Sequence, residues 1–260
     1  MIPVKPKKSL GQHFLTDTNI ARKIVDSLTF SNYNQVLEIG PGMGVLSVYL
    51  LDLPDKEVMF IEIDRSSIDY LNEHLPGIRD KIYDGDVMRI NLSEFFEGPF
   101  AVIGNFPYNI SSQLFFKILE NKGQVTEIVC MLQKEVARRL ASPPGSREYG
   151  ILSVLLQAYY DIEYLFTVPP HVFNPPPKVQ SAVIKLRRND RQALPCNEVL
   201  FKKVVKTAFN QRRKVLRNSL RSMYHPDAMM DEIFRKRPEQ LGVEDFVKLT
   251  LMAEKQDQIV

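Results

Sequence analysis

Short apolar runs alternate with amphipathic segments through the first two-thirds of this 260-residue chain. Apolar runs of roughly four to eight residues are typical of buried strands, and apolar positions three and four residues apart indicate a helix face. The predicted strands are Gln35–Ile39, Val58–Ile63, Ile82–Tyr83, Phe100–Ile103, Glu127–Leu132 and Ser181–Leu186. The predicted helices are Asn19–Leu28, Gly44–Leu51, Ser66–Leu75, Ser111–Asn121, Lys134–Ala141 and Ile151–Tyr160. This alternation predicts an α/β fold, a doubly wound parallel sheet with helices on both faces.

The pattern changes toward the end of the chain, where strand signals cease. Two proline clusters come first: "SPPGS" (Ser142–Ser146) is typical of a surface loop and "VPPHVFNPPPKV" (Val168–Val179) of a rigid extended segment. The helices predicted after them are Glu198–Phe209, Arg212–Met223, Met229–Phe234 and Glu244–Glu254. The end of the chain is therefore expected to be entirely helical.

We place a domain boundary in Asn189–Pro195, where the mixed pattern gives way to helices alone. Residues 1–190 would form the larger domain, beginning with a basic arm over residues 1–13, and residues 191–260 a small all-α domain. Two unequal domains are an ordinary arrangement for a chain of this length.

The basic residues are unevenly distributed, although the net charge is only +3. The segment Lys202–Arg221 carries eight Lys and Arg residues and no acidic one. A localised positive field suggests a polyanionic partner such as a nucleic acid. A solvated helix face is the alternative explanation of the same charges.

Cysteine content and hydropathy indicate the cellular compartment in which the protein is expected. The two cysteines, Cys130 and Cys196, lie far apart in no metal-binding or redox spacing, so neither a disulfide framework nor a metal site is expected. No apolar run approaches the roughly 20 residues of a membrane helix, and "MIPVKPKKSLGQ" lacks the apolar middle of a signal peptide. We expect a cytoplasmic protein without a membrane partner, and a monomer as the default.

The segment "VLEIGPGMG" (Val36–Gly44) predicts a nucleotide site, because a strand runs into Gly40, Gly42 and Gly44 and then into a helix. Glycine permits a tight turn and a close approach by a ligand, and the arrangement is typical of Rossmann-like folds. A nicotinamide fingerprint requires G-x-G-x-x-G, but position 45 is Val. Glycines placed for packing are the alternative.

Acidic residues at successive strand ends sharpen this prediction. Glu62 lies 22 positions after Gly40 and suits ribose hydroxyls, and Asp86 follows the next strand, where it suits an adenine amino group. Glu38 is an unusual charge within an apolar strand. Solvated strand-end acids are the alternative for Glu62, Asp64 and Asp86, but their succession favours a ligand.

The pattern E-x-G-x-G-x-G with these two acids resembles the class I S-adenosylmethionine-dependent methyltransferases. The resemblance implies that Gly40, Glu62 and Asp86 contact the methionine end, the ribose and the adenine of that cofactor.

The turn "NFPY" (Asn105–Tyr108) predicts chemistry on the exocyclic amine of a base. The lone pair of this amine is delocalised, so acceptors for both N–H groups favour the pyramidal nitrogen of the transition state. Asn105 offers its side-chain carbonyl and Phe106 its backbone carbonyl, Pro107 stiffens the turn, and Tyr108 offers a face to an extruded base. The turn resembles the N-x-P-Y motif of amino-methylating nucleic-acid methyltransferases. A plain turn with Tyr108 in the core is the alternative.

Six segments together resemble the ribosomal RNA small-subunit adenine dimethyltransferase family over essentially the whole chain. They are "KKSLGQHFLTD" (Lys7–Asp17), "EIGPGMG", "GNFPYNISS", "REYGILSVLLQAYY" (Arg147–Tyr160), "VFNPPPKVQSAVIKL" (Val172–Leu186) and "AFNQRRKVLRNSL" (Ala208–Leu220). The resemblance implies dimethylation of N6 of two adjacent adenosines near the 3′ end of small-subunit ribosomal RNA. It also implies S-adenosylmethionine as the methyl donor, the small ribosomal subunit as partner, and a role in its assembly.

Carried over residue by residue, the resemblance also implies the site. The implied cofactor contacts are His13, Leu15, Gly40, Gly42, Glu62, Asp86 and Asn105. The residues implied to contact RNA phosphates are Arg212, Arg213, Lys214 and Arg217, with Lys5, Lys7 and Lys8 of the arm as further candidates. Position 13 is often Asn in the family and position 106 commonly Leu or Ile, so His13 and Phe106 depart from its pattern.

Three other functions remain open at this point. Large-subunit ribosomal RNA methyltransferases that confer antibiotic resistance share the fold and the motif, but "NPPPKV" and "AFNQRRK" look more like the small-subunit enzyme. A binding factor that has lost catalysis is disfavoured by the intact glycines, acids and "NFPY". A nicotinamide oxidoreductase is disfavoured by the glycine spacing.

Overall fold

The computed structural model describes residues 4–257, which divide into two compact units. The first comprises the chain up to Ala137 together with Asp161–Arg188, and the second comprises Arg138–Tyr160 together with the chain from Asn189. The division after Arg188 falls close to the predicted boundary, but residues 138–160 group with the C-terminal helices, which the sequence analysis did not anticipate. Residues 1–3 of the predicted arm and 258–260 of the predicted all-α domain lie outside the described residues.

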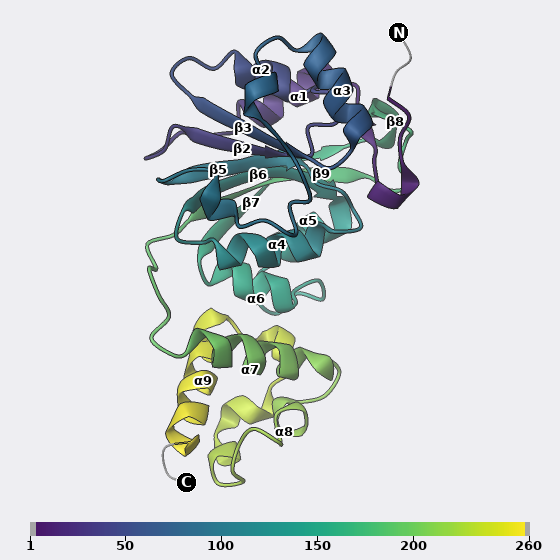
Figure 1. Ribbon diagram of the computed structural model, residues 1–260. Coiled ribbons are helices and arrows are strands. Elements are labelled where there is room, and N and C mark those ends of the chain that lie inside the picture. The colour runs from purple at the N-terminus through teal and green to yellow at the C-terminus, as the bar shows by residue number, and fades with distance from the viewer. Residues whose placement is uncertain (1–3, 258–260) are drawn as a thin grey trace. The chain divides into compact units, whose positions relative to one another are not determined.

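The first unit is built on a seven-stranded sheet in the order β4-β3-β2-β5-β6-β9-β7 (Figure 1). Its strands are β2 (Gln35–Ile39), β3 (Glu57–Glu62), β4 (Ile82–Asp84), β5 (Phe100–Asn105), β6 (Val125–Gln133), β7 (Tyr160–Val168) and β9 (Ser181–Arg188). Strands β2 to β6 pair in parallel and β9 runs antiparallel to β6. The α/β prediction is confirmed, with the correction that the sheet is mixed rather than purely parallel.

Three strands were not predicted. The short strands β1 (Phe14–Leu15) and β8 (Phe173–Asn174) pair with each other in a separate sheet, which joins the N-terminal arm to the proline-rich segment. Strand β7 is long, but it lies at the sheet edge and its interior is only partly buried, so charged residues interrupt its apolar pattern. Its first residue, Tyr160, was assigned to the preceding helix, which ends earlier, at Gln157.

Helices cover both faces of this sheet, with α1, α2 and α3 on one face and α4 on the other (Figure 1). The helices that begin in the first unit are α1 (Thr18–Val25), α2 (Ser47–Leu51), α3 (Arg65–His74), α4 (Ser111–Glu120) and α5 (Lys134–Ala141), with 3₁₀ turns at Lys8–Leu10, Arg79–Lys81, Leu92–Glu94 and Pro170–Val172. Side-chain caps fix two helix starts: the Asp17 carboxylate accepts from the N–H groups of Asn19 and Ile20, and that of Asp64 from Ser66.

The second unit is helical, as predicted. It contains α6 (Ile151–Gln157), α7 (Glu198–Asn210), α8 (Leu216–Ser219), α9 (Val243–Asp257) and 3₁₀ turns at Ala228–Met230, Glu232–Arg235 and Pro238–Gln240. The prediction of one helix over Arg212–Met223 is wrong, because residues 211–214 form a turn and Val215 is extended before α8 begins. The predicted helix Met229–Phe234 consists instead of two 3₁₀ turns.

The strand order places a crevice between β2 and β5, where crossovers leave in opposite directions and ligands of open α/β sheets bind. The two strands approach so closely that a Cβ at Gly104 would lie 2.4 Å from the Ile39 carbonyl oxygen. Glycine is therefore required directly before Asn105. None of the helices within residues 4–257 is long and apolar enough to cross a membrane.

Candidate active site

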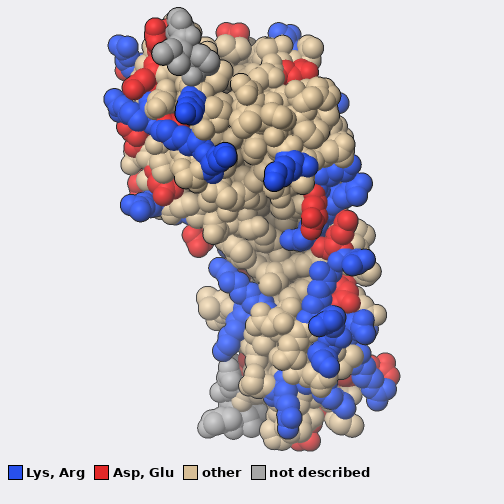
Figure 2. Space-filling model, turned by 90° about the vertical axis from the view of Figure 1, so that its right-hand side faces the viewer, with Lys and Arg blue, Asp and Glu red and all other residues tan. Residues whose placement is uncertain are grey.

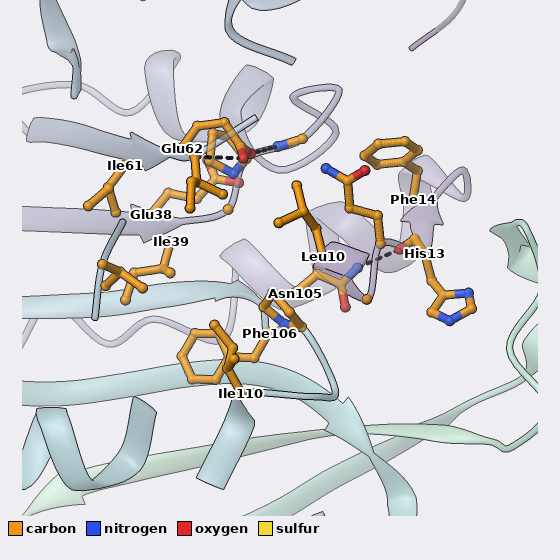
Figure 3. Close-up of a pocket in the computed structure, with 18 of the residues that line it drawn as sticks. Leu10, His13, Phe14, Glu38, Ile39, Ile61, Glu62, Asn105, Phe106 and Ile110 are labelled. Atoms are coloured by element: carbon orange, nitrogen blue, oxygen red, sulfur yellow. Dashed lines mark hydrogen bonds between the residues drawn. The ribbon is translucent and has the colours of Figure 1, made fainter. Parts of the chain in front are cut away.

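A pocket of about 280 Å³ lies at the carboxyl ends of β2, β3, β4 and β5 (Figure 3). It is lined by the glycine turn after β2, the end of β3, the loop after β4, the turn after β5 and part of the N-terminal arm. Every catalytic and cofactor residue predicted from the sequence contributes to this lining: His13, Leu15, Gly40, Gly42, Glu62, Asp86, Asn105, Phe106, Pro107 and Tyr108. The structure brings all ten to one pocket, while their individual roles stay predictions.

The glycine turn presents bare backbone to the pocket. Gly40 and Gly42 have φ angles of +70° and +58°, a conformation that side chains rarely adopt. At Gly40 an added Cβ would meet nothing within 4 Å, so this part of the turn faces open space. At Gly42 an added Cβ would lie 2.9 Å from the Phe14 ring. The turn thus needs glycine both for its conformation and for the fit of the arm above it.

Glu62 is held rigidly at the end of β3. Its Oε2 accepts from the Gly42 N–H at 3.0 Å, and its Oε1 accepts from the N–H groups of Ile63 and Asp64, both at 2.9 Å. Burial raises the pKa of this carboxyl, and the three backbone hydrogen bonds oppose the rise. Since a carboxylate offers about four acceptor positions, Glu62 retains capacity for a hydroxyl of a ligand. The next residue, Ile63, lines the pocket and is 49% exposed, which supplies an apolar wall beside the carboxylate.

The structure explains why an acidic residue, Glu38, can occupy an apolar strand. The side chain is 1% exposed, and Ser47 Oγ donates to its Oε2 at 2.7 Å. Burial raises the pKa of Glu38 to about 8; the Ser47 hydrogen bond lowers it and the nearby charge of Glu62 raises it. Around neutral pH this carboxyl is therefore mostly protonated, which is compatible with its buried position beside the pocket.

Asp86 lies in the loop after β4 and lines the same pocket as the glycine turn. Its Oδ1 accepts from the Met88 N–H at 2.9 Å, and its Oδ2 lies 3.5 Å from Arg89 Nε. The neighbouring Val87 is buried and also lines the pocket. The loop therefore offers a carboxylate beside an apolar surface, a combination that suits the edge and face of a purine.

The N-terminal arm lines part of the pocket and is tied to Asp64, the N-cap of α3. Lys7 Nζ lies 2.5 Å from Asp64 Oδ1, and Gln12 Nε2 donates to Asp64 Oδ2 at 2.9 Å. Burial would raise the pKa of Asp64, but the hydrogen bonds from Lys7 and Gln12 outweigh it and the pKa is lowered. Gly11 has φ +63°, and an added Cβ there would lie 2.5 Å from Asn109 Oδ1. Lys7, predicted as an RNA contact, is thus engaged within the unit.

The "NFPY" turn directs its amide toward the pocket (Figure 3). Asn105 Nδ2 donates to the His13 carbonyl at 2.8 Å, which fixes the orientation of the side-chain amide. Because the two amide substituents diverge, Oδ1 faces away from that bond and is offered as an acceptor. The Phe106 ring is fully buried against Phe115, so the departure from Leu or Ile at this position is absorbed in the core.

Two contacts hold the Tyr108 ring, one at its hydroxyl and one on a face of the ring. Its hydroxyl lies 2.5 Å from Ser181 Oγ, at the start of β9. The His13 ring stacks on it with a centroid distance of 5.4 Å and an interplanar angle of 28°. His13 Nδ1 in turn lies 2.8 Å from the Pro175 carbonyl oxygen, to which it donates. The side chain of His13 therefore supports Tyr108, and its backbone carbonyl supports Asn105.

The comparison with protein families identifies the chain. Residues 4–254 match the model of the ribosomal RNA adenine dimethylase family. The chain belongs to the ribosomal RNA adenine dimethylase family. Two similar members are the ribosomal RNA small subunit methyltransferases A of Parabacteroides distasonis and Porphyromonas gingivalis. The first is 57% identical over 255 residues, covering 97% of this chain and 95% of the relative; the second is 56% identical over 256 residues, covering 97% and 99%.

Solved structures agree with this membership of the dimethylase family. A dimethyladenosine transferase from Plasmodium falciparum has a TM-score of 0.82 and 27% identity, covering 94% of this chain and 98% of that one. The 23S ribosomal RNA methyltransferase ErmE has a TM-score of 0.67 and 25% identity, covering 91% and 99%. The dimethyladenosine transferase is therefore the more similar of the two, although both have the same kind of fold.

The basic segment of this dimethylase uses its arginines in two ways. Arg212 donates to the carbonyl of Arg147 and, at 2.8 Å, to that of Tyr149, and Arg217 donates to the Met229 carbonyl at 2.9 Å. Arg213 and Lys214 are exposed. Figure 2 shows Lys and Arg side chains gathered on the pictured face of the second unit. Of the four residues predicted to bind RNA, two are thus engaged with their own unit.

Sequence reasoning missed three residues that hold the site together: Gln12, Pro175 and Ser181. Each lies inside a segment that was quoted for its family resemblance, but none carries a charge that would single it out. Pro175 and Ser181 act on residues far away in the sequence, His13 and Tyr108, so no local spacing could reveal them. Gln12 does lie next to His13, and its partner Asp64 directly follows a recognised strand.

Proposed function

We propose that this dimethylase binds S-adenosylmethionine in the pocket and transfers its methyl groups to N6 of two adjacent adenosines near the 3′ end of small-subunit ribosomal RNA. One observation carries the proposal: the "NFPY" turn opens into the pocket that the glycine turn, Glu62 and Asp86 also line. A site for a nucleoside cofactor and a site for an exocyclic amine therefore meet. The names of the relatives that are 57% and 56% identical support small-subunit RNA as the substrate.

The residues present fit such a cofactor. The open backbone at Gly40 can accommodate the methionine end, the spare acceptor position of Glu62 suits a ribose hydroxyl, and Asp86 suits the adenine amino group. Ile63 and Val87 supply apolar contact for the purine ring. When bound, the cofactor supplies a methyl group made electrophilic by its positively charged sulfur.

The turn would prepare the amine for attack. Asn105 Oδ1 and the Phe106 carbonyl accept hydrogen bonds from the two N–H groups, which favours a pyramidal nitrogen whose lone pair is localised. The amide needs no particular protonation state, and its hydrogen bond to the His13 carbonyl aims it before the substrate arrives. Pro107 limits the motion of the turn, and the partly buried Tyr108 ring offers a face to the extruded adenine.

We further propose that the second unit holds the RNA by its phosphates, with Arg213 and Lys214 as direct contacts. Both are exposed and adjacent, whereas Arg212 and Arg217 donate to backbone carbonyls of the same unit. Lys and Arg contacts to phosphate position a nucleic acid without reading its sequence. The choice of adenosines would then depend on the shape of the RNA and on the pocket.

The test uses purified protein and labelled S-adenosylmethionine with small and large ribosomal subunits, both from cells that lack the modification. We expect label in N6,N6-dimethyladenosine at two adjacent positions near the 3′ end of the RNA. Label confined to large-subunit RNA would instead establish the resistance-type activity of which the fold is also capable. Binding to the subunit without any label would identify a binding factor and overturn the proposed reaction.

A further inference from the structure

The hydroxyl of Tyr108 has a role that the proposed reaction does not explain. A base that lies on an aromatic ring uses the ring face, and the phenol oxygen takes no part in methyl transfer. In this structure that oxygen lies 2.5 Å from Ser181 Oγ, which ties the edge of the ring to the first residue of β9. Ser181 is fully buried and pairs with Gln133 in the β6–β9 ladder. Its Oγ is therefore held in place by the sheet, whereas Tyr108 lies in a loop that no strand pairing holds.

A second support acts on the same ring. His13 stacks on Tyr108 and donates from Nδ1 to the Pro175 carbonyl. Pro175 and Ser181 belong to one stretch of chain that runs from β8 into β9, so this stretch holds the ring on its face through His13 and at its edge through Ser181. Losing one support would loosen the ring without releasing it.

The second methyl transfer should depend most on this support. Adenine offers two N–H groups to Asn105 and Phe106, but the monomethylated amine offers only one. The singly methylated base is therefore held by fewer hydrogen bonds, and stacking on Tyr108 contributes a larger share of its positioning. A loosened ring should impair the second transfer more than the first.

We propose that Ser181 is a positioning residue that fixes the plane of the Tyr108 ring and thereby determines whether methylation proceeds to the dimethyl product. The proposal rests on the proposed function, because it takes Tyr108 as the surface that receives the adenine. It assigns to a buried serine, for which the resemblance implied no role, an effect on product distribution rather than on cofactor binding.

The first experiment compares Ser181→Ala, Tyr108→Phe and the double variant, with unmodified small subunits as substrate. Each single variant should lower kcat about tenfold, in line with the loss of one buried hydrogen bond. The ratio of monomethyl to dimethyladenosine should rise, and the Kd for S-adenosylmethionine should stay unchanged. The double variant should be no worse than the poorer single variant, since both remove the same bond. Tyr164→Phe is the matched control, because it removes a similar bond, 2.7 Å from Thr167 Oγ1, on β7 at the sheet edge.

A second measurement needs no turnover. With 3-fluorotyrosine in place of tyrosine, the Tyr108 resonance is assigned by its loss in Tyr108→Phe. The line shape of this fluorine resonance should indicate a Tyr108 ring in one conformation in the wild type and in Tyr164→Phe, and a ring that exchanges between conformations in Ser181→Ala. Wild-type activity together with an unchanged product ratio in Ser181→Ala and Tyr108→Phe would overturn the positioning role and leave the proposed function intact. If the wild type makes no dimethyladenosine, the proposed function fails. In that case a fixed wild-type ring that becomes mobile in Ser181→Ala supports the positioning contact, and an identical ring signal overturns it.

Discussion

The pocket and the basic segment of residues 202–221 both carry side chains for which the sequence predicts a function, but they hold them differently. In the pocket, backbone groups aim two of the polar side chains: three N–H groups hold Glu62, and the His13 carbonyl orients Asn105. In the basic segment, two arginines donate to backbone carbonyls and their neighbours extend into solvent. Residue type therefore predicts a position well where strand ends converge, and predicts the contacts of a side chain poorly where a charged group has several partners within reach.

Asn105→Ala tests the pocket, and we expect it to have the largest effect of the variants, a loss of turnover. The change removes the proposed acceptor for the amine, so kcat should fall by about a hundredfold or more, the range seen when one preorganised transition-state donor or acceptor is lost. Methyl transfer to unmodified small subunits, followed by single-turnover kinetics, measures the loss. RNA affinity should remain close to that of the wild type.

Because Asn105 also bonds to the arm, the same variant needs a structural control. The Kd for S-adenosylmethionine and the free energy of unfolding should show whether the loss of the bond to the His13 carbonyl disturbs the pocket as a whole. Turnover near the wild-type rate would refute the role assigned to the amide. A collapse of cofactor binding would mean that Asn105 acts mainly by holding the arm.

A second test uses the pH dependence that the buried Glu38 imposes on the free energy of unfolding. Burial raises its pKa from 4.5 to about 8, so the folded protein binds this proton more tightly than the unfolded chain does. The contribution of this group to stability is fully present below about pH 4.5 and is lost as the pH rises through about 8. We expect Glu38→Gln, which cannot ionise, to flatten that decline, an effect on the order of a few kcal/mol by pH 8. Urea unfolding at several pH values measures it, and parallel curves for the two proteins would contradict the assignment.

The sequence predicted the two regions unequally for physical reasons. Glycines and acids at strand ends have few conformational alternatives in a parallel sheet, so Gly40, Glu62 and Asp86 fell into the pocket as expected. Within the turn at residues 211–214, Arg212 donates hydrogen bonds to carbonyls more than sixty positions earlier, which no local pattern encodes. The contact between Tyr108 and Ser181 was hidden for the same reason.

Arg212→Ala tests the structural side of the basic segment. Two charge-assisted hydrogen bonds to the Arg147 and Tyr149 carbonyls would be lost, so we expect the free energy of unfolding to fall by about 2 kcal/mol. Arg213→Ala is the matched control, since it removes the same side chain one position later from an exposed site. Equal stability of the two variants in urea unfolding would show that the Arg212 bonds contribute nothing beyond solvation.

The smallest effect is expected from the double variant Arg213→Ala/Lys214→Ala, which tests the side chains left for the RNA. Its stability should match the wild type, while the affinity for small-subunit RNA should fall about tenfold at low salt, since each phosphate contact releases counterions. The plot of log K against log salt has a negative slope, and the magnitude of that slope should become smaller by about two, one for each lost contact. Arg79→Ala/Lys81→Ala removes the same charge from the turn before β4, at the amino end of that strand, and should leave the slope unchanged. If both double variants weaken binding equally, the RNA responds to overall charge, and the basic segment has no special place in its recognition.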